Sequence, residues 1–323
     1  MNSSEEIKVS IICLSYNHFH YIENALIGFL DQKCNFNFEI VVHDDASSDD
    51  SADVIKRYRD KYPDKFKIIL QNTNQYSQNV NLPLSHCFSV AVGQYIAFCE
   101  GDDYWTDPYK LQKQVDFLDE NPDYGLVFTD FDMLYQERGV IRTSCFKSNP
   151  KKFPLATTLD RFIFFRSYMA PCTWLMRRAY IYKPVPELAA LDSTFCWLVD
   201  ILSQTKIYFI DVSTSVYRVL EESASHSKSF SKMLQRESNI LRCQEYYSHQ
   251  FGLPKSIIDS IHLKHIDKTV HLNIALNNKE SVDEARACFA DLSLRSKILC
   301  LISYMPLSSS IVKCIYKYKH LFK

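Results

Sequence analysis

Three short apolar runs, each cut off by a cluster of polar residues, constrain the fold of this chain more than any other feature. They occupy residues 8–14, 38–43 and 94–99 and show no helical period. Continuous apolar runs of this kind are typical of strands that a parallel sheet buries on both faces. Segments with apolar residues at helical spacing lie between them, as at 21–30 and 52–62. The alternation predicts an α/β fold built on a doubly wound, mostly parallel, Rossmann-like sheet.

The same alternation continues along the chain. Further strands are predicted at residues 66–70, 124–130, 172–176 and 206–210, and further helices at 84–92, 109–121, 159–165 and 193–202. Beyond residue 230 the pattern is helical, with helices predicted at 233–251, 255–275 and 281–292. A chain of 323 residues has room for one large domain and an appendage. We therefore expect a sheet-containing domain over residues 1–228 and a C-terminal helical extension over residues 229–323.

The run at 94–99 ends at three carboxylates, Glu100, Asp102 and Asp103, with Gly101 among them. Carboxylates this close together repel one another unless a cation lies between them. Oxygen ligands suit hard ions such as Mg²⁺ and Mn²⁺, which commonly share their coordination sphere with the phosphates of a substrate. The cluster therefore predicts a site for Mn²⁺ or Mg²⁺ that also holds a phosphorylated substrate. A solvated acidic turn is the alternative interpretation.

The other two runs also end in side chains suited to ligand binding. Residues 15–18 (Ser, Tyr, Asn, His) follow the first run, and Asp44 and Asp45 follow the second. Ligands of doubly wound sheets bind beyond the carboxyl ends of the strands, so we expect all three clusters on one edge of the sheet. Asp44 and Asp45 could equally form a turn and a helix cap.

Charge and cysteine content narrow the class of partner. The chain has 37 lysines and arginines against 38 acids, a formal net charge of −1. It therefore lacks the overall positive field that gathers nucleic acid, and no nucleic-acid partner is expected. The 11 cysteines form no Cys-x-x-Cys pair, which favours a reduced, intracellular protein. A polar N-terminus and the lack of a bilayer-spanning apolar run predict a cytoplasmic protein.

The last stretch, residues 296–323, combines apolar side chains with lysines. Apolar residues between 298 and 302 precede Pro306, and four lysines follow among aromatic residues. This composition suits a peripheral segment that lies on an anionic membrane surface. A helix that docks onto the core fits the same pattern, and both interpretations remain open.

Three motifs together resemble the family 2 inverting glycosyltransferases with a GT-A fold, particularly the bacterial enzymes that build surface polysaccharides. Residues 9–17 resemble the family's first strand and nucleotide-contacting turn, with Leu14 where a proline is usual. Residues 39–49 are similar to its second motif, with Ala46 where a glycine is commoner. Residues 100–105 match its metal-binding acid motif.

The resemblance is specific over residues 7–131, weaker over residues 170–227 and absent beyond. It implies roles for the residues of the matching motifs. The implied nucleotide-sugar ligands are Ser15, Tyr16, Asn17, Asp44, Asp45, Asp102, Arg218 and His226. The implied metal ligands are Asp103 and Asp102, with Glu100 helping through water.

The resemblance also implies a general base, which is a carboxylate at the start of a later helix. Asp192 occupies that place, and Asp200 is kept as a second candidate because the acid that usually comes just before the base is Leu191 here. A nucleoside diphosphate leaves readily once a metal and a nearby cation, Arg218 or His226, neutralise its developing charge. One carboxylate on the opposite face is enough to take the proton of the attacking hydroxyl group, and a single displacement inverts the anomeric centre.

The predicted function is metal-dependent, inverting transfer of a hexose-type sugar from a nucleoside-diphosphate sugar to a hydroxyl group of a saccharide or lipid-linked saccharide acceptor, in surface polysaccharide biosynthesis. The expected location is the cytoplasm, including the inner face of the plasma membrane. One alternative is a sugar-nucleotide nucleotidyltransferase, but residues 15–18 lack the glycine-rich basic loop of that class. The other is a non-catalytic protein that retains the fold, but such a protein would be expected to lose Asp102 or Asp103.

Overall fold

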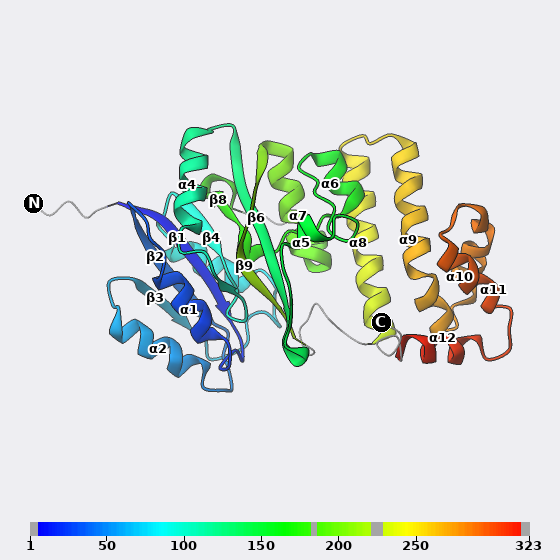
Figure 1. The fold of residues 1–323 in the computed structure, drawn as a ribbon, viewed down its shortest axis with the longest axis horizontal. Helices are drawn as coiled ribbons and strands as arrows, with labels where there is room; N and C mark the ends of the chain where they lie inside the picture. Colours follow the sequence, from blue (N-terminus) through cyan, green and yellow to red (C-terminus); the bar gives the residue numbers. More distant parts are fainter. Residues whose placement is uncertain (1–5, 182–185, 221–228, 318–323) are drawn as a thin grey trace, which may run out of the picture. The chain divides into compact units, whose positions relative to one another are not determined.

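The chain divides into two units, residues 1–220 and 221–323 (Figure 1). The computed structural model describes residues 6–181, 186–220 and 229–317. The boundary predicted after residue 228 falls outside these ranges and stays a prediction.

The first unit is built on a nine-stranded sheet with the strand order β3-β2-β1-β4-β8-β6-β9-β5, and β7 pairs with β6 beside this path. The strands are β1 (Ile7–Ser15), β2 (Asn37–Asp44), β3 (Phe66–Leu70), β4 (Tyr95–Phe98), β5 (Tyr104–Trp105), β6 (Tyr124–Tyr135), β7 (Val140–Arg142), β8 (Leu175–Arg177) and β9 (Lys206–Val219). The first four in this order are parallel neighbours. β8 then runs antiparallel to β4 and β6, while β9 is parallel to β6. The predicted doubly wound α/β sheet is confirmed, with β8 inserted against the direction of its neighbours.

Helices follow most strands of this unit, as the alternation predicts. They are α1 (Ile22–Leu30), α2 (Ser51–Lys61), α3 (Leu82–Val90), α4 (Lys110–Glu120), α5 (Cys145–Ser148), α6 (Leu159–Phe165) and α7 (Pro186–Gln204). Consecutive residues of β1, including Val9, Ile11 and Ile12, are at most 1% exposed. Because successive side chains of a strand point to opposite faces, the sheet is covered on both sides.

The pair β6 and β9 is longer than the sequence predicts. Asp130, taken as a polar strand end, lies within β6 at two register shifts. Its carboxylate accepts hydrogen bonds from the backbone N–H groups of Phe131 at 2.8 Å and Phe146 at 2.9 Å, so this buried acid is satisfied inside the strand. β9 likewise runs unbroken to Val219, well beyond the strand predicted at 206–210. Its far end pairs antiparallel with β5, with Tyr104 opposite Val216.

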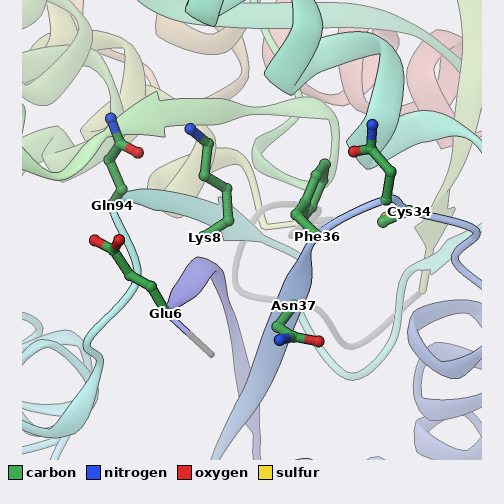
Figure 2. A pocket seen from close by; sticks show the side chains of 7 residues that line it. Glu6, Lys8, Cys34, Phe36, Asn37 and Gln94 are labelled. Carbon is green, nitrogen blue, oxygen red and sulfur yellow. The ribbon is translucent and has the colours of Figure 1, made fainter. Parts of the chain in front are cut away.

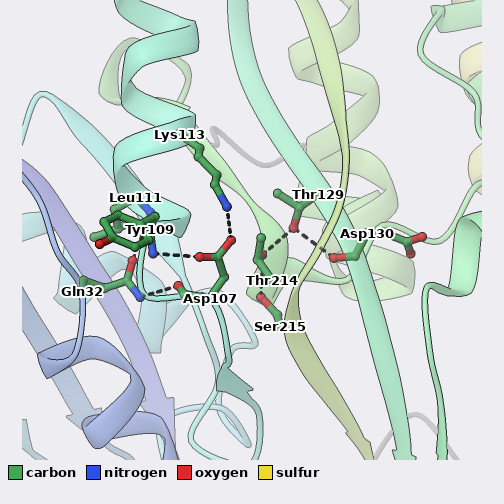
Figure 3. A network of polar contacts seen from close by, with 9 residues as sticks. All are labelled: Gln32, Asp107, Tyr109, Leu111, Lys113, Thr129, Asp130, Thr214 and Ser215. Carbon is green, nitrogen blue, oxygen red and sulfur yellow. Dashed lines mark hydrogen bonds and ion pairs between the residues drawn. The ribbon is translucent and has the colours of Figure 1, made fainter.

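A network of hydrogen bonds holds the chain just after Trp105 (Figure 3). The Gln32 side-chain amide donates to the carbonyl of Asp107 at 2.9 Å, and the Asp107 carboxylate accepts from the N–H of Tyr109 at 2.8 Å and pairs with Lys113. Asp107 thus closes a turn just before α4, where the sequence pattern places the helix start; the helix itself begins at Lys110, with Tyr109 at its N-cap position. Nearby, the hydroxyl groups of Thr129 and Thr214 lie 2.6 Å apart and link β6 to β9.

The second unit is helical. Its helices are α8 (Phe230–Gln250), α9 (Lys255–Ala275), α10 (Lys279–Ala287), α11 (Leu294–Ile302) and α12 (Ser308–Lys317). Helices α9, α10, α11 and α12 share one buried apolar cluster, which includes Val270, Ile274, Val282 and Leu299. The helices predicted over 233–251 and 255–275 are confirmed, the first beginning three residues earlier. None of the helices in the described ranges has both the length and the apolar character needed to span a bilayer.

Candidate active site

The ends of β1, β2 and β4 meet at one edge of the sheet. Ser15 pairs with Asp44 in the parallel register, and the N–H of Asp45 donates to the carbonyl of Ser15 at 2.9 Å. The N–H of Gly101 donates to the carbonyl of Leu14 at 2.8 Å, which holds the acid motif beside the end of β1. The sequence-based prediction that these polar clusters share one edge is confirmed.

The acid motif forms a compact cluster. Glu100, Asp102 and Asp103 each offer a carboxylate oxygen, and these atoms all lie within 4.8 Å of one another. Asp103 is buried, Asp102 is partly buried and Glu100 is the most exposed of the three. This segment joins β4 to β5.

The three carboxylates perturb one another. Desolvation and repulsion from Asp102 raise the pKa of Glu100 to about 7. Desolvation, with repulsion from Asp102 and Glu100, also raises the pKa of Asp103 well above its usual range, although the N–H of Arg218 acts in the opposite direction. Near neutral pH the cluster therefore retains a proton unless a cation takes its place.

The residues present fit a divalent cation. Asp102 Oδ1 is buried without a hydrogen-bond partner, which is costly for a carboxylate oxygen and leaves it free to bind a cation. The donor set is all oxygen, as hard ions such as Mg²⁺ and Mn²⁺ require. All three predicted metal ligands belong to this cluster.

Arg218, on β9, lies against the acid motif. Its backbone N–H donates to Asp103 Oδ1 at 2.8 Å and its Nε donates to the carbonyl of Asp102 at 2.7 Å. Nη1 donates to the side chain of Gln136, and the guanidinium lies over the rings of Tyr21 and Tyr104 at 4.7 and 5.2 Å. Nη2 is buried and has no hydrogen-bond partner. The side chain is thus locked in place with one N–H₂ group available to an anion.

The two acids after β2 already carry hydrogen bonds from the protein. Asp44 accepts from the N–H and hydroxyl of Ser47 at 3.0 and 2.6 Å, as in a capped turn. Asp45 accepts from the N–H groups of Gln75 at 2.7 Å and Tyr76 at 2.9 Å, so it anchors the loop between β3 and α3. The turn interpretation therefore describes part of what both residues do. A carboxylate has further lone pairs, so their contact with a nucleotide stays a prediction.

The side chains of Ser15 and Tyr16 are available to a ligand, whereas the side chain of Asn17 has a structural role. Ser15 Oγ is buried and unpartnered, whereas Tyr16 is 45% exposed. Asn17 has a φ of +55° and its side-chain oxygen accepts from the N–H of Ser48 at 2.8 Å, which ties the turn after β1 to the turn after β2. Ala46 also has a positive φ, +64°, in keeping with a position where glycine is commoner.

Asp192 and Asp200 occupy different places on α7. Asp192 has a non-helical backbone (φ −158°, ψ 92°) at a kink, and its Oδ1 accepts from the N–H of Phe195 at 3.0 Å, so it caps the segment that follows. Asp200 lies eight residues further on, about 12 Å along the helix axis. The two acids are therefore alternatives for the role of general base. His226, the other predicted anion ligand, lies outside the described residues.

Sequence reasoning missed Tyr76 and Gln136 near this site and gave His18 no role of its own. Tyr76 lies close enough to Glu100 and Asp192 for both charges to add to desolvation in raising the pKa of its phenol. His18 has Nε2 4.0 Å from Asp102 Oδ2 and a buried, unpartnered Nδ1. Gln136 accepts from Arg218 across a long sequence separation. The tyrosine and the glutamine carry no local signal, whereas the histidine stands in the polar cluster at 15–18.

A hollow of about 470 Å³ lies elsewhere on the same unit (Figure 2). Its lining includes Glu6, Lys8, Cys34 and Asn37, which are at the amino-terminal ends of β1 and β2 or just before them. Ligands of parallel sheets bind at the carboxyl ends, so this hollow is on the wrong edge to serve the acid cluster.

The family model of glycosyl transferase family 2 matches residues 10–183 of the chain. Among curated relatives, the Mycobacterium tuberculosis protein Rv1520, named an uncharacterized protein, is 42% identical over 129 residues, which are 40% of this chain and 36% of the relative. The Escherichia coli protein named UDP-Glc:alpha-D-GlcNAc-diphosphoundecaprenol beta-1,3-glucosyltransferase WfaP is 31% identical over 143 residues, which are 44% of this chain and 52% of WfaP. The chain thus matches about half or less of the length of these relatives.

Two solved structures resemble the chain along almost its whole length. Residues 1–349 of Staphylococcus aureus TarS, in complex with UDP-GlcNAc, match 97% of this chain and 92% of that one at 20% identity, with a TM-score of 0.57. The mannosyltransferase PcManGT from Pyrobaculum calidifontis, in complex with GDP-Man and Mn²⁺, matches 98% and 88% at 14% identity, with a TM-score of 0.54. At these identities the likeness shows the fold, which is the predicted GT-A-like α/β fold followed by helices.

Proposed function

Because the chain belongs to glycosyl transferase family 2, we propose that it transfers a sugar from a nucleoside-diphosphate sugar to a hydroxyl group of a saccharide or lipid-linked saccharide, with inversion of the anomeric centre. The observation that carries this proposal is the meeting of a carboxylate cluster with Arg218 at the carboxyl edge of the sheet. The carboxylate cluster suits a divalent cation, and the guanidinium of Arg218 suits a phosphate. A bound diphosphate requires both of these positive charges.

The donor diphosphate would lie between the acid cluster and Arg218. Asp102 and Asp103 would hold Mn²⁺ or Mg²⁺, with Glu100 acting through water. When bound, the cation neutralises charge on the leaving diphosphate. The unpartnered Nη2 of Arg218 would donate to the same diphosphate, in a geometry fixed by its bonds to Asp102 and Gln136.

The nucleoside would lie over the turns that follow β1 and β2. Ser15 has a buried hydroxyl group without a partner, and Tyr16 is exposed beside it. Asp44 and Asp45 complete this side of the site, and Asn17 holds the two turns together. An orphaned hydroxyl group at a ligand edge is expected to gain its partner from the ligand.

Asp192 is the proposed general base. A group that takes a proton from the acceptor must be within reach of the hydroxyl group as it attacks, on the side away from the leaving diphosphate. The shared electrostatic influence of Asp192 and Glu100 on Tyr76 supports a place for Asp192 near the acid cluster. Asp200 remains the second candidate.

The acceptor class is the least constrained part of the proposal. The name of WfaP describes transfer to a sugar on diphosphoundecaprenol, a lipid-linked saccharide. By analogy we place the acceptor of this chain among saccharides or lipid-linked saccharides of surface polysaccharide biosynthesis, and the reaction in the cytoplasm or at the inner face of the plasma membrane.

The test is a panel of UDP- and GDP-sugars incubated with the protein, Mn²⁺ or Mg²⁺ and a set of saccharide acceptors. Release of UDP or GDP that needs both metal and acceptor supports the proposal, and the anomeric configuration of the product reports inversion. Release of pyrophosphate from a sugar phosphate and a nucleoside triphosphate would instead identify a nucleotidyltransferase. A protein that shows no metal-dependent response to any nucleotide in thermal unfolding would be the non-catalytic alternative.

A further inference from the structure

An edge of the C-terminal unit carries six exposed hydrophobic side chains, which we call the α11–α12 apolar edge. They are Leu294 (75% exposed), Ile298 (49%), Leu301 (59%), Tyr304 (68%), Met305 (53%) and Leu307 (77%). Leu294, Ile298 and Leu301 follow helical spacing on α11 and form one stripe, and the other three lie in the turn between α11 and α12. The opposite face of α11, with Leu299 and Cys300, is already buried in the core of the unit. The helix therefore presents a second apolar face that its own unit does not cover.

The backbone conformation of Leu307 is unusual as well. This residue adopts a φ of +62°, a left-handed conformation that a leucine rarely takes and that asparagine or glycine takes more easily. It is also the most exposed residue of the edge. A bulky apolar side chain at a strained, solvent-exposed position does not stabilise the fold, so we look for its role in binding.

Charge indicates what the edge contacts. Between Leu292 and Lys323 the sequence contains six lysines and arginines, namely Arg295, Lys297, Lys313, Lys317, Lys319 and Lys323, and no aspartate or glutamate. Arg295, Lys297 and Lys313 are not within ion-pair distance of any carboxylate in the described part of the chain. Of the acids near the edge, Asp267 accepts the N–H of Ser293 at 2.8 Å, and Asp283 is paired with Arg286, whose guanidinium lies 4.0 Å over the ring of Tyr304. Unpaired cations thus flank exposed apolar side chains.

We propose that the α11–α12 apolar edge binds the surface of an anionic lipid bilayer, with its apolar side chains among the acyl chains and its cations against the headgroups. An amphipathic segment that is apolar on one side and basic on its flanks is suited to this position. A second copy of the chain is a poorer occupant, since it would bring the same uncompensated positive charges face to face. The proposal does not depend on the reaction that the first unit catalyses.

The test is sedimentation of the full-length protein with sucrose-loaded vesicles of phosphatidylcholine alone or mixed with phosphatidylglycerol. We expect binding to the anionic vesicles that weakens as salt is raised, because the screening length shortens. The double variant Leu294→Ser/Leu307→Asn should lower the partition coefficient at least about tenfold. The variant Lys297→Gln/Lys313→Gln should lower it about fivefold per removed charge.

Two matched controls accompany these variants. Val92→Ser/Ile141→Ser removes two exposed aliphatic side chains, 59% and 51% accessible, from the other unit. Lys232→Gln/Lys255→Gln removes two exposed lysines from α8 and α9. Both controls should bind within about twofold of the original protein. Because asparagine suits the left-handed backbone, Leu307→Asn alone should keep or raise the thermal midpoint while weakening binding, which separates lipid contact from misfolding.

Three results would overturn the proposal. The first is no sedimentation with anionic vesicles, or equal sedimentation with neutral ones. The second is vesicle binding that Leu294→Ser/Leu307→Asn leaves unchanged. The third is a concentration-dependent dimer in analytical ultracentrifugation that the same variant dissociates, which would assign the edge to a second copy of the chain.

Discussion

Individual residues at the sheet edge differ in whether their polar atoms have partners. Ser15 Oγ, Asp102 Oδ1 and Arg218 Nη2 are all buried and unsatisfied. Leaving one such atom without a partner costs about 1–3 kcal/mol, so three of them near one edge are expensive for folding alone. A ligand that satisfies them on binding is the simplest physical reason for their presence.

Arg218→Lys tests this reasoning at one side chain. Lysine keeps the charge but cannot donate at once to the Asp102 carbonyl, to Gln136 and to a ligand. We expect kcat to fall by about 10²–10³, and the thermal midpoint to fall as well because at least one of the bonds to Asp102 and Gln136 is lost. The control is Arg142→Lys, an exposed arginine over the ring of Tyr135. Steady-state kinetics that do not distinguish Arg218→Lys from the control would show that the guanidinium serves only the structure.

The choice between Asp192 and Asp200 is also decided by single residues. Asparagine still accepts the N–H of Phe195, so Asp192→Asn should preserve the helix cap and the fold. We expect it to retain metal-dependent nucleotide binding and to lose about 10²–10⁴ in turnover, because the proton acceptor is gone. Asp200→Asn is the matched variant and should remain active. Full activity in Asp192→Asn would transfer the role of base to Asp200 or to another acid.

At the scale of elements, α4 buries a polar stripe instead of a purely apolar one. Lys110 and Gln114 are both fully buried, and Lys110 Nζ donates to Gln114 Oε1 at 2.7 Å while lying 4.4 Å over the ring of Trp105. Gln114 in turn donates to the carbonyl of Thr173 at 2.8 Å, which links α4 to the segment before β8. Hydrogen bonds satisfy the polar atoms of this stripe, but burial removes the Lys110 amino group from water.

Lys110→Met should change how stability depends on pH. Desolvation lowers the pKa of Lys110 to about 7 in the folded protein, whereas an unfolded lysine titrates near 10.4. Between these values the unfolded chain binds a proton that the folded chain does not, so this group makes stability rise with pH by up to about 1.4 kcal/mol per unit. Below the folded pKa both states bind the proton, and the contribution to the slope vanishes. The variant should lose the slope between pH 7 and 10.

Urea unfolding at several pH values measures this slope. Lys113→Met is the control on the same helix, because Lys113 is half exposed, pairs with Asp107 and should leave the slope unchanged. The loss of the Gln114 partner lowers the absolute stability of Lys110→Met at every pH, so the comparison is of slopes only. Equal slopes in all three proteins would mean that Lys110 keeps its proton in the fold across this range.

For the whole molecule, local patterns predicted the sheet edge but not the contacts that cross between distant segments. Ser15, Asp44 and Glu100 were placed together because each ends a buried strand, and parallel strands end on one side. Asp130 was misread as a strand end, since nothing in sequence shows that the N–H of Phe146 returns to satisfy it. Tyr76 reaches the site only because Asp45 holds its loop. Hydrogen bonds of this kind depend on how the fold brings distant segments together, and no periodic pattern in the sequence signals them.

The division of the chain into units 1–220 and 221–323 predicts how a ligand alters unfolding. All described residues of the proposed donor site belong to the first unit, so UDP or GDP with Mn²⁺ should stabilise that unit by about 2.7 kcal/mol at a hundredfold excess over Kd. This corresponds to about 5–10 °C in its midpoint. Differential scanning calorimetry should therefore show one transition that moves with ligand and one that does not, and Asp103→Asn should abolish the shift. A single transition that moves as a whole would mean that the two units unfold together, and a shift that survives in Asp103→Asn would place the nucleotide away from the acid cluster.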